Sequence, residues 1–314
     1  YSSGNPAIGV GPGNVPVLVD APADLPLAAK RIIESKSFDN SILCTNESVL
    51  IVEESIADAF RRALKQNNGF IVSGQDLDKL RETVFPNGHF DISNIGKDAT
   101  WIAERAGTRV PPSTKVLVAK FALVVPEEPL AHEKLCPVLG FVTVPTAARG
   151  IETARSVLRI TGAGHSAAIH SNDPQIIMAY SSRVPVLRVS VNVGNSLGSA
   201  GIETNLAPTM TIGTGFFGHS SVGENLEPKH LINFTRIAVN ADKREAMPHM
   251  EGINPWNTPS GQVPRYPAPS NAADSITSPM PQRRSGPRGI EESDSVREEI
   301  RRIIVEELQA LMKE

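Results

Sequence analysis

Cys44 is the residue whose type and setting best suit covalent chemistry in this chain of 314 residues. It ends the polar segment KSFDNSILC and is followed by an apolar stretch, Val49 to Val52. The other cysteine is Cys136, and two cysteines give neither a disulfide framework nor a metal-ligand spacing. The chemistry open to Cys44 is therefore that of a single thiolate nucleophile. A buried structural thiol is the alternative, and it is the commoner fate of a lone cysteine.

A glycine-rich run, GVGPGNVPV, lies upstream of Cys44 and begins at Gly9. Closely spaced glycines let the backbone approach a ligand and expose N–H groups to an anion. The run is neither a G-x-G-x-x-G nor a Walker A pattern. By itself it indicates either a ligand-binding loop or a turn that binds nothing.

Together with Cys44, this run resembles the CoA-acylating branch of the aldehyde dehydrogenase superfamily, of the acetaldehyde and propionaldehyde type. The matching segments follow one another over about residues 1–240: GVGPGNVPV, KSFDNSILC, EKLCPVLGF, GAGHSAAIHS and LAPTMTIGTGFFGHSSVGENLEPKHLIN. The resemblance implies an α/β fold with an aldehyde dehydrogenase-like catalytic domain, and NAD and coenzyme A as cofactor and co-substrate. Cys44 would attack a short-chain aldehyde, propionaldehyde or acetaldehyde, and hold the acyl group as a thioester.

The type of residue at the position of Val10 distinguishes two branches of this superfamily. In hydrolytic relatives a glutamate in the glycine-rich loop activates water, and the matching position here is Val10. A valine side chain cannot take a proton, so the resemblance implies that coenzyme A resolves the acyl-enzyme. A hydrolytic aldehyde dehydrogenase that releases a carboxylate is the alternative.

Further site residues follow from the same resemblance. It implies cofactor contacts for six residues: Gly9, Gly11, Pro12, Gly13, Glu133 and Leu135. Glu133 matches a glutamate that holds a ribose of the nicotinamide cofactor, because a carboxylate supplies acceptors for two hydroxyls. A solvated loop carboxylate is the alternative for Glu133. Cys136, flanked by apolar residues, is interpreted as a packed thiol.

His165, in GAGHSAAIHS, matches a histidine of the acylating enzymes. An imidazole titrates near neutral pH, so His165 would be the base that takes the proton of the coenzyme A thiol. A histidine that only hydrogen-bonds its loop is the alternative. His170 and His230 are predicted to be structural, and the histidine spacing predicts no metal site.

The composition fits a soluble enzyme. The chain is 40% hydrophobic and 21% charged, with a net charge of −3. Its length and apolar content are enough for one or two packed cores. A charge this close to neutral argues against a nucleic-acid partner. No run of eighteen apolar residues exists, so no membrane span is predicted. Free thiols indicate a cytoplasmic location.

Alternating strand and helix patterns predict an α/β catalytic thiol domain over residues 37–210. Residues 1–36 would be the end of a Rossmann-type dinucleotide-binding domain, and the resemblance places the rest of it before Tyr1. We therefore expect a fragment, and a non-catalytic fragment that acts in assembly is an alternative function. The predicted strands are 14–19, 49–52, 116–119, 122–125, 167–170 and 186–193, and the predicted helices are 23–34, 56–64, 77–84 and 151–159.

The segment 211–240 is predicted to end in a further strand, 231–239. In the family that the chain resembles, this closing strand pairs across subunits. The resemblance therefore implies a homo-oligomer.

Residues 241–292 contain nine prolines and few aliphatic residues, which predicts a disordered linker. Residues 293–314 have a capping box and an apolar stripe and predict an amphipathic helix. An isolated helix of this length is marginal in water, so it should have a partner. Docking on its own domain and self-association are two alternatives. The third is a resemblance to encapsulation peptides, which implies binding to a shell protein or cargo helix in the lumen of a bacterial microcompartment.

Overall fold

The computed structural model describes residues 7–242, 244–245, 249–252 and 254. The chain divides into two units, Tyr1–Arg236 and Ile237–Glu314. Nearly all of the predicted linker 241–292 and the whole predicted helix 293–314 lie outside the described residues. The fold below is that of the first unit.

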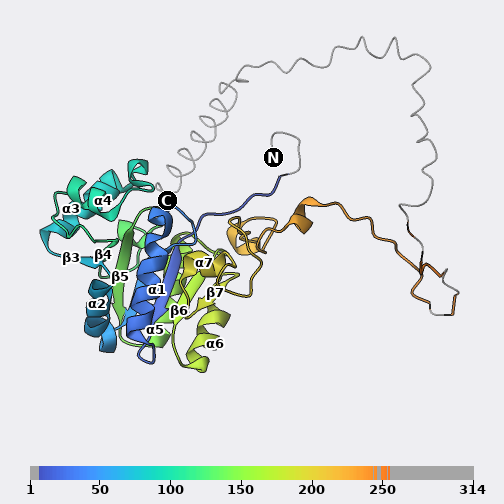
Figure 1. The fold of residues 1–314 in the computed structure, drawn as a ribbon. Helices are drawn as coiled ribbons and strands as arrows, with labels where there is room; N and C mark the ends of the chain where they lie inside the picture. The colour runs from blue at the N-terminus through green and yellow to red at the C-terminus, as the bar shows by residue number, and fades with distance from the viewer. Residues whose placement is uncertain (1–6, 243, 246–248, 253, 255–314) are drawn as a thin grey trace, which may run out of the picture. The chain divides into compact units, whose positions relative to one another are not determined.

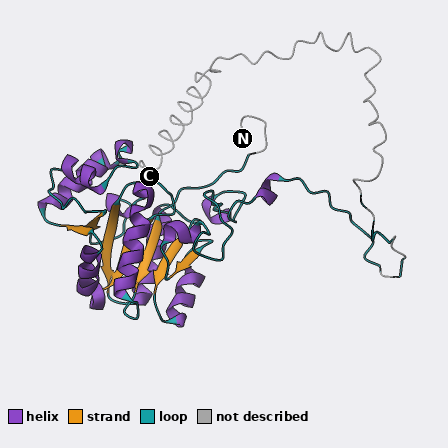
Figure 2. Ribbon diagram, in the orientation of Figure 1, coloured by secondary structure: helices purple, strands orange, loops and turns teal. Residues whose placement is uncertain are grey.

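Seven parallel strands form the centre of this unit (Figures 1 and 2). They are β1 (Val15–Val19), β2 (Glu47–Glu53), β3 (Gly69–Val72), β4 (Val116–Lys120), β5 (Val138–Val144), β6 (Ala167–His170) and β7 (Val189–Val191). Their order in the sheet is β3-β4-β5-β2-β1-β6-β7. In β1, Leu18 pairs with Ile51 of β2 on one side and with Ile169 of β6 on the other. Runs such as VPVLV are typical of strands covered on both faces.

Helices connect most of the strands and cover the sheet (Figure 2). They are α1 (Leu25–Ser37), α2 (Ala57–Gln66), α3 (Gln75–Val84), α4 (Ala99–Arg105), α5 (Ala147–Ile160), α6 (Pro174–Arg183) and α7 (Asn195–Ser199). Side-chain caps mark where α1, α5 and α6 begin: Asp24, Thr146 and Asp173 each accept hydrogen bonds from the first turn.

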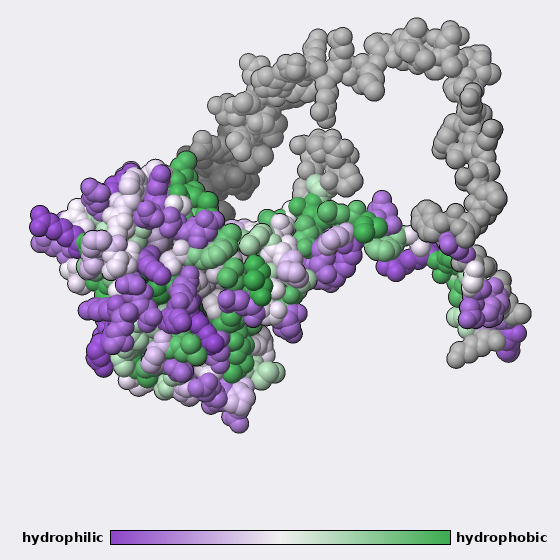
Figure 3. All heavy atoms as spheres, viewed as in Figure 1, coloured by the Kyte–Doolittle hydropathy of each residue, from purple (hydrophilic) through white to green (hydrophobic). Residues whose placement is uncertain are grey.

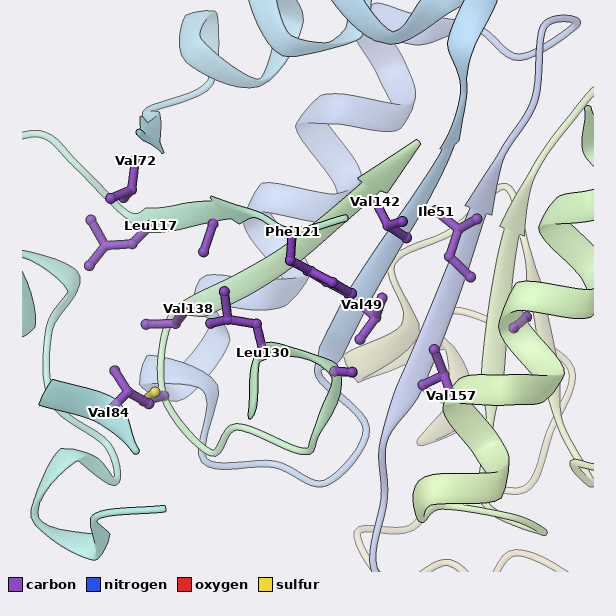
Figure 4. Close-up of a cluster of buried hydrophobic side chains, with 14 of the residues drawn as sticks. Val49, Ile51, Val72, Val84, Leu117, Phe121, Leu130, Val138, Val142 and Val157 are labelled. Carbon is purple, nitrogen blue, oxygen red and sulfur yellow. The ribbon is translucent and has the colours of Figure 1, made fainter. Parts of the chain in front are cut away.

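Two apolar clusters, one on each face of the sheet, form the core. One packs α1 and α2 against residues such as Val17 and Leu50. The other packs α3 to α6 against Leu18, Val49 and Ile51, and Figure 4 shows part of it. Successive strand residues point to opposite faces, so the strand at the centre of the sheet contributes to both clusters.

The α/β prediction is confirmed, and most predicted elements exist within a few residues of their expected bounds. The patterns missed β3, β5, α4, α6 and α7. β1 lies in the same seven-stranded sheet as the strands of residues 37–210, and α1 packs on that sheet. The domain boundaries stay predictions. The predicted strand 186–193 is shorter, because only Val189–Val191 pairs with β6.

The predicted strand at residues 122–125 is wrong: the segment forms no strand, because it has no neighbouring strand within the described part of the chain. Residues 231–239 pair with no described strand of the same chain, and their pairing across subunits stays a prediction. Leu123, Leu231 and Phe234 are exposed. Figure 3 shows one face of the molecule, with hydrophobic side chains on the segment that is orange in Figure 1. Among the described residues, no helix is long and apolar enough to cross a membrane.

Candidate active site

The predicted site residues lie at one edge of the sheet. Residues 9–13 precede β1, Cys44 precedes β2, Glu133 precedes β5 and His165 precedes β6. Because the strands are parallel and these four are consecutive in the sheet, the loops before them are neighbours. Ligands of doubly wound sheets usually bind at the opposite edge, beyond the carboxyl ends of the strands. We call the observed location the amino edge.

A well-anchored turn presents Cys44. The preceding η1 helix (Phe38–Ser41) contains three non-glycine residues in the left-handed region of φ. Thr45, the next residue, donates from Oγ1 to the Ser196 carbonyl at 3.1 Å. Cys44 is half-buried, whereas Cys136 is fully buried, which confirms that Cys136 is a packed thiol.

The surroundings of Cys44 favour its protonated form. Burial raises the pKa of the thiol, and the negative charge of Glu133 raises it further. The Arg188 guanidinium opposes this and lowers the Cys44 pKa. Because only the thiolate is nucleophilic, burial and Glu133 oppose the reactive form of Cys44, and Arg188 favours it.

Gly13 joins the cysteine turn to Glu133. Its backbone N–H donates to Glu133 Oε1 at 3.2 Å. A Cβ atom at Gly13 would collide with the Cys44 carbonyl oxygen and lie 3.3 Å from Glu133 Oε1. Burial raises the pKa of Glu133 to about 7. The three residues therefore form one contact group, in which only a glycine fits the middle position.

Lys134 holds the loop that carries Glu133. Its ammonium is buried and donates to the carbonyls of Leu130 and His132 at 2.7 and 2.6 Å, and to Ser48 Oγ at 3.1 Å. Burial lowers the pKa of Lys134 well below its ordinary value. This lysine uses its three hydrogens to tie the loop to β2, a role that the sequence analysis did not foresee.

The rest of the glycine-rich loop is more open. Gly11 N donates to Thr214 Oγ1 at 3.1 Å, so the loop contacts a segment about two hundred residues away. Val10 is 49% exposed, Pro12 is exposed and Gly9 is half-buried. Leu135, predicted with Glu133 as a cofactor contact, is half-buried, and its carbonyl accepts from Gly96 N.

His165 is buried at the end of a loop that packs directly against the loop of Thr214. Gly164 has a φ of +80°, and a Cβ there would collide with the Thr214 carbonyl oxygen. His165 Nδ1 lies 2.9 Å from Ser166 Oγ, while Nε2 has no partner among the described residues. Burial, and then the charge of Arg188, lower the pKa of His165 to about 4, so the ring is neutral near pH 7.

Arg188, just before β7, is the site residue that sequence reasoning missed. Its guanidinium is buried and donates to the carbonyls of His165 and Gly223 at 3.0 and 2.8 Å, and to the Asn225 side chain. Within the described residues it makes no ion pair with a carboxylate. A charged residue inside an apolar strand pattern is costly to bury, and that signal could have identified it.

The two histidines predicted to be structural, His170 and His230, make other contacts. His170 is buried on β6, and its pKa is lowered to about 4 by burial and by Arg31. His230 closes a capping box with Glu227 and contacts Glu224. No group of three or more metal-binding side chains occurs in the part of the chain that the structure describes.

Comparisons with known proteins show which enzymes the chain is similar to. No protein-family model matches the chain. An aldehyde-alcohol dehydrogenase from Clostridium acetobutylicum is 37% identical over 252 residues, which are 79% of this chain and 29% of that protein. The chain therefore spans less than a third of the length of this curated relative.

Two solved structures show the same fold. An acetylating aldehyde dehydrogenase from Geobacillus thermoglucosidasius superposes with a TM-score of 0.74 at 36% identity, over 79% of this chain and 54% of that one. A propionaldehyde dehydrogenase from the Clostridium phytofermentans fucose utilisation bacterial microcompartment gives a TM-score of 0.62 at 28% identity, over 70% of this chain and 50% of that one.

Proposed function

Because the chain belongs to the acylating aldehyde dehydrogenases, we propose that it carries the thiol site of an NAD-dependent enzyme that converts a short-chain aldehyde and coenzyme A to an acyl-CoA. The observation that carries this proposal is the contact group of Cys44, Gly13 and Glu133 at the amino edge. Propionaldehyde is our first choice of substrate and acetaldehyde the second.

The residues present fit a nicotinamide cofactor. Glu133 is half-buried beside Cys44, and a carboxylate there suits the two hydroxyls of a ribose. Gly13 keeps the space between the two residues free of a side chain. The bound cofactor would supply the acceptor for the hydride that leaves the substrate carbon. Cofactor contacts by Gly9, Gly11, Pro12 and Leu135 stay predictions.

Covalent catalysis by Cys44 proceeds in two stages in this proposal. The thiolate sulfur bonds to the aldehyde carbon, and the carbonyl π electrons move to oxygen to give a hemithioacetal. Loss of hydride from that carbon leaves a thioester on Cys44. The thiol of coenzyme A then loses its proton and its sulfur bonds to the acyl carbon, while the bond from that carbon to Cys44 breaks. The released Cys44 thiolate takes up one proton, so the step balances. Arg188 favours the Cys44 thiolate both when it attacks the aldehyde and when it is released from the thioester.

Val10 supports thiolysis over hydrolysis. It is exposed in the loop next to the cysteine turn and cannot accept a proton from water. The nearby carboxylate of Glu133 accepts a hydrogen bond from Gly13 N, which holds one of its oxygens. His165 belongs to the acyl-transfer step of this proposal, either as the predicted base or as a hydrogen-bond donor.

The test uses the reverse of the second stage, which needs no hydride acceptor. The chain is incubated with propionyl-CoA, and intact mass and peptide mapping follow acylation while free coenzyme A is measured. We expect one propionyl group on Cys44 and an equal amount of released coenzyme A. Cys44→Ala should abolish both, and Cys136→Ala, the matched control, should retain both. No acyl group on Cys44 in the unchanged chain would reject the proposal.

The two alternative functions give other results. Coupled with a hydride acceptor, a hydrolytic dehydrogenase would form NADH without coenzyme A, whereas the acylating enzyme needs it. A non-catalytic assembly fragment would not acylate Cys44 at all.

We also propose that residues 293–314 direct the protein into a bacterial microcompartment. The predicted linker and amphipathic helix support this, as does the microcompartment origin of one similar structure. Deletion of residues 293–314 should leave Cys44 acylation intact and remove co-purification with shells. Unfolding of the first unit after deletion would instead favour docking of the helix on its own domain. The exposed apolar segment 231–239 supports a homo-oligomer.

A further inference from the structure

The buried side chain of Asn195, the first residue of α7, uses its full hydrogen-bonding capacity. Its Oδ1 accepts from Ser190 Oγ and Ser199 Oγ, both at 2.8 Å. Its Nδ2 donates to the Thr45 carbonyl at 2.7 Å and to Ser166 Oγ at 3.0 Å. A side-chain amide has two hydrogens and two lone pairs, so every position is occupied.

The Thr45 carbonyl determines the orientation of the Asn195 side-chain amide. A carbonyl oxygen only accepts hydrogen bonds, so it must face Nδ2, and a flipped amide would place two oxygens against each other. Nδ2 only donates, so Ser166 Oγ accepts from Asn195. The hydroxyl hydrogen of Ser166 is then left to bond elsewhere.

His165 Nδ1 is the atom of the described chain placed to accept that hydrogen. It lies 2.9 Å from Ser166 Oγ, and no second acceptor for this hydroxyl occurs in the described residues. A ring nitrogen that accepts carries no hydrogen itself, so a neutral imidazole holds its one hydrogen on Nε2. His165 Nε2 is buried without a partner in the described chain, which makes it an N–H group with no acceptor.

We infer that Asn195 and Ser166 are positioning residues that hold His165 as its Nε2–H tautomer, so that the ring donates a hydrogen bond to an oxygen or sulfur of the acyl-transfer substrate. This inference rests on the proposed function and deepens it. It replaces the base role that the sequence predicts, because an Nε2 that already carries hydrogen cannot take a proton from a thiol.

Electrostatics at the site agree with the donor role. The Arg188 guanidinium donates to the His165 carbonyl, so a fixed positive charge lies close to the ring. Burial and this charge lower the pKa of His165 to about 4, and both disfavour the imidazolium that a base would become. A neutral N–H donor in a buried site stabilises negative charge that develops on a substrate atom.

Asn195 also holds the turn that carries Cys44. Asn195 Nδ2 holds the carbonyl of Thr45, which follows Cys44, and Asn195 N donates to Glu47 Oε1 at 2.7 Å. One buried side chain thus couples the turn of Cys44 to the ring of His165.

The tautomer can be measured without any activity. Two-bond ¹H–¹⁵N correlation spectra of the full chain, labelled with ¹⁵N-histidine, distinguish a protonated from a bare ring nitrogen, and His165→Gln identifies the His165 signals. We expect a bare Nδ1 and a protonated Nε2 between about pH 6 and 8. Ser166→Ala should populate both tautomers, and Ser156→Ala, a control whose hydroxyl donates to the Glu152 carbonyl on α5, should keep one. A protonated Nδ1, or a tautomer unchanged in Ser166→Ala, would overturn the inference.

Acyl transfer from propionyl-CoA gives the second readout. The amide N–H of His165→Gln replaces the Nε2–H donor, so its rate should fall no more than about threefold, whereas His165→Ala should lose about tenfold for one hydrogen bond. Equal losses of about 10²- to 10⁴-fold in both variants would indicate a general base and overturn the donor role. A chain with the expected tautomer that never acylates Cys44 would reject the proposed function alone, and an acylating chain with a protonated Nδ1 would reject this inference alone.

Discussion

The two edges of the sheet carry similar polar residues and use them differently. At the carboxyl edge, beyond β1, β6 and β7, the side chains bond to one another: Ser171 Oγ donates to Asp20 at 2.6 Å, and the Asn192 amide exchanges two hydrogen bonds with the Ser171 backbone. Asp173 caps α6 there. This edge joins helices to the sheet.

At the amino edge, Glu133 and Arg188 form no ion pair within the described residues. Arg188 bonds to carbonyl and amide oxygens, His165 Nε2 is unbonded within the described chain, and Glu133 lies beside Cys44. Such groups cost stability when buried. Asp20 Oδ1 and His170 Nε2 at the carboxyl edge also have no partner among the described residues, so an unpaired atom alone does not distinguish the edges. What distinguishes the amino edge is that Glu133 and Arg188 act electrostatically on the half-buried thiol of Cys44. The predictions below test this contrast, in order of their expected effect on Cys44.

Gly13→Ala should have the largest effect. The added methyl group would collide with the Cys44 carbonyl oxygen, so the cysteine turn or the Glu133 loop must move. Because a shift of about 1 Å can cost about 100-fold in rate, we expect at least that loss in acylation by propionyl-CoA. Gly107→Ala is the control: its φ is +67° and no atom lies within 4 Å of an added Cβ. It should lose about 1 kcal/mol of stability and keep its acylation rate.

Arg188→Met should weaken both the site and the fold. Three acceptor groups lose their donor, so the free energy of unfolding should fall by about 3 kcal/mol in denaturant titrations. The Arg188 charge lowers the Cys44 pKa, so its removal should shift the pH profile of Cys44 alkylation by iodoacetamide to higher pH. Arg188→Lys keeps the charge and should shift the profile less. An unshifted profile in Arg188→Met would contradict the electrostatic role.

Glu133→Gln should shift the same profile in the opposite direction. The carboxylate charge raises the Cys44 pKa, and a neutral amide of the same shape removes that charge. Thiolate then forms at lower pH, and alkylation at a fixed pH below the midpoint should become faster. Glu127→Gln, in the exposed loop before Glu133, is the charge-matched control and should leave the profile unchanged. An unshifted profile in Glu133→Gln would contradict the effect of the Glu133 charge and would leave burial as the cause of the raised Cys44 pKa.

Asp173→Ala, at the carboxyl edge, should leave Cys44 chemistry untouched. The variant loses the cap bonds to Gln175 N and Ile176 N, which should cost about 1 kcal/mol and lower the melting temperature by about 2–4 °C. Acylation measured below that transition should match the unchanged chain. A loss of acylation would contradict the prediction that the carboxyl edge takes no part in Cys44 chemistry.

The sequence predicted β1, β2 and α1 from their apolar patterns, but it missed β5, whose run VLGFVTV is as apolar. It also missed the helix α6. It predicted a strand at residues 122–125 that does not form, because a strand needs a neighbouring strand that composition does not reveal. Cys44, Glu133 and His165 emerged from motifs in separate loops, and the fold brings these loops to one edge. Their catalytic and cofactor-binding roles stay predictions.

By itself the sequence determined which segments pack inside, since apolar runs are local, and it singled out a thiol with family-specific neighbours. Only the tertiary structure decided what those neighbours touch. Gly13 donates a hydrogen bond to Glu133, Arg188 to His165 and Asn195 to Thr45, each pair far apart in the chain. Such hydrogen bonds and charges depend on distance in space, which the order of strands in the sheet sets and the order of residues does not.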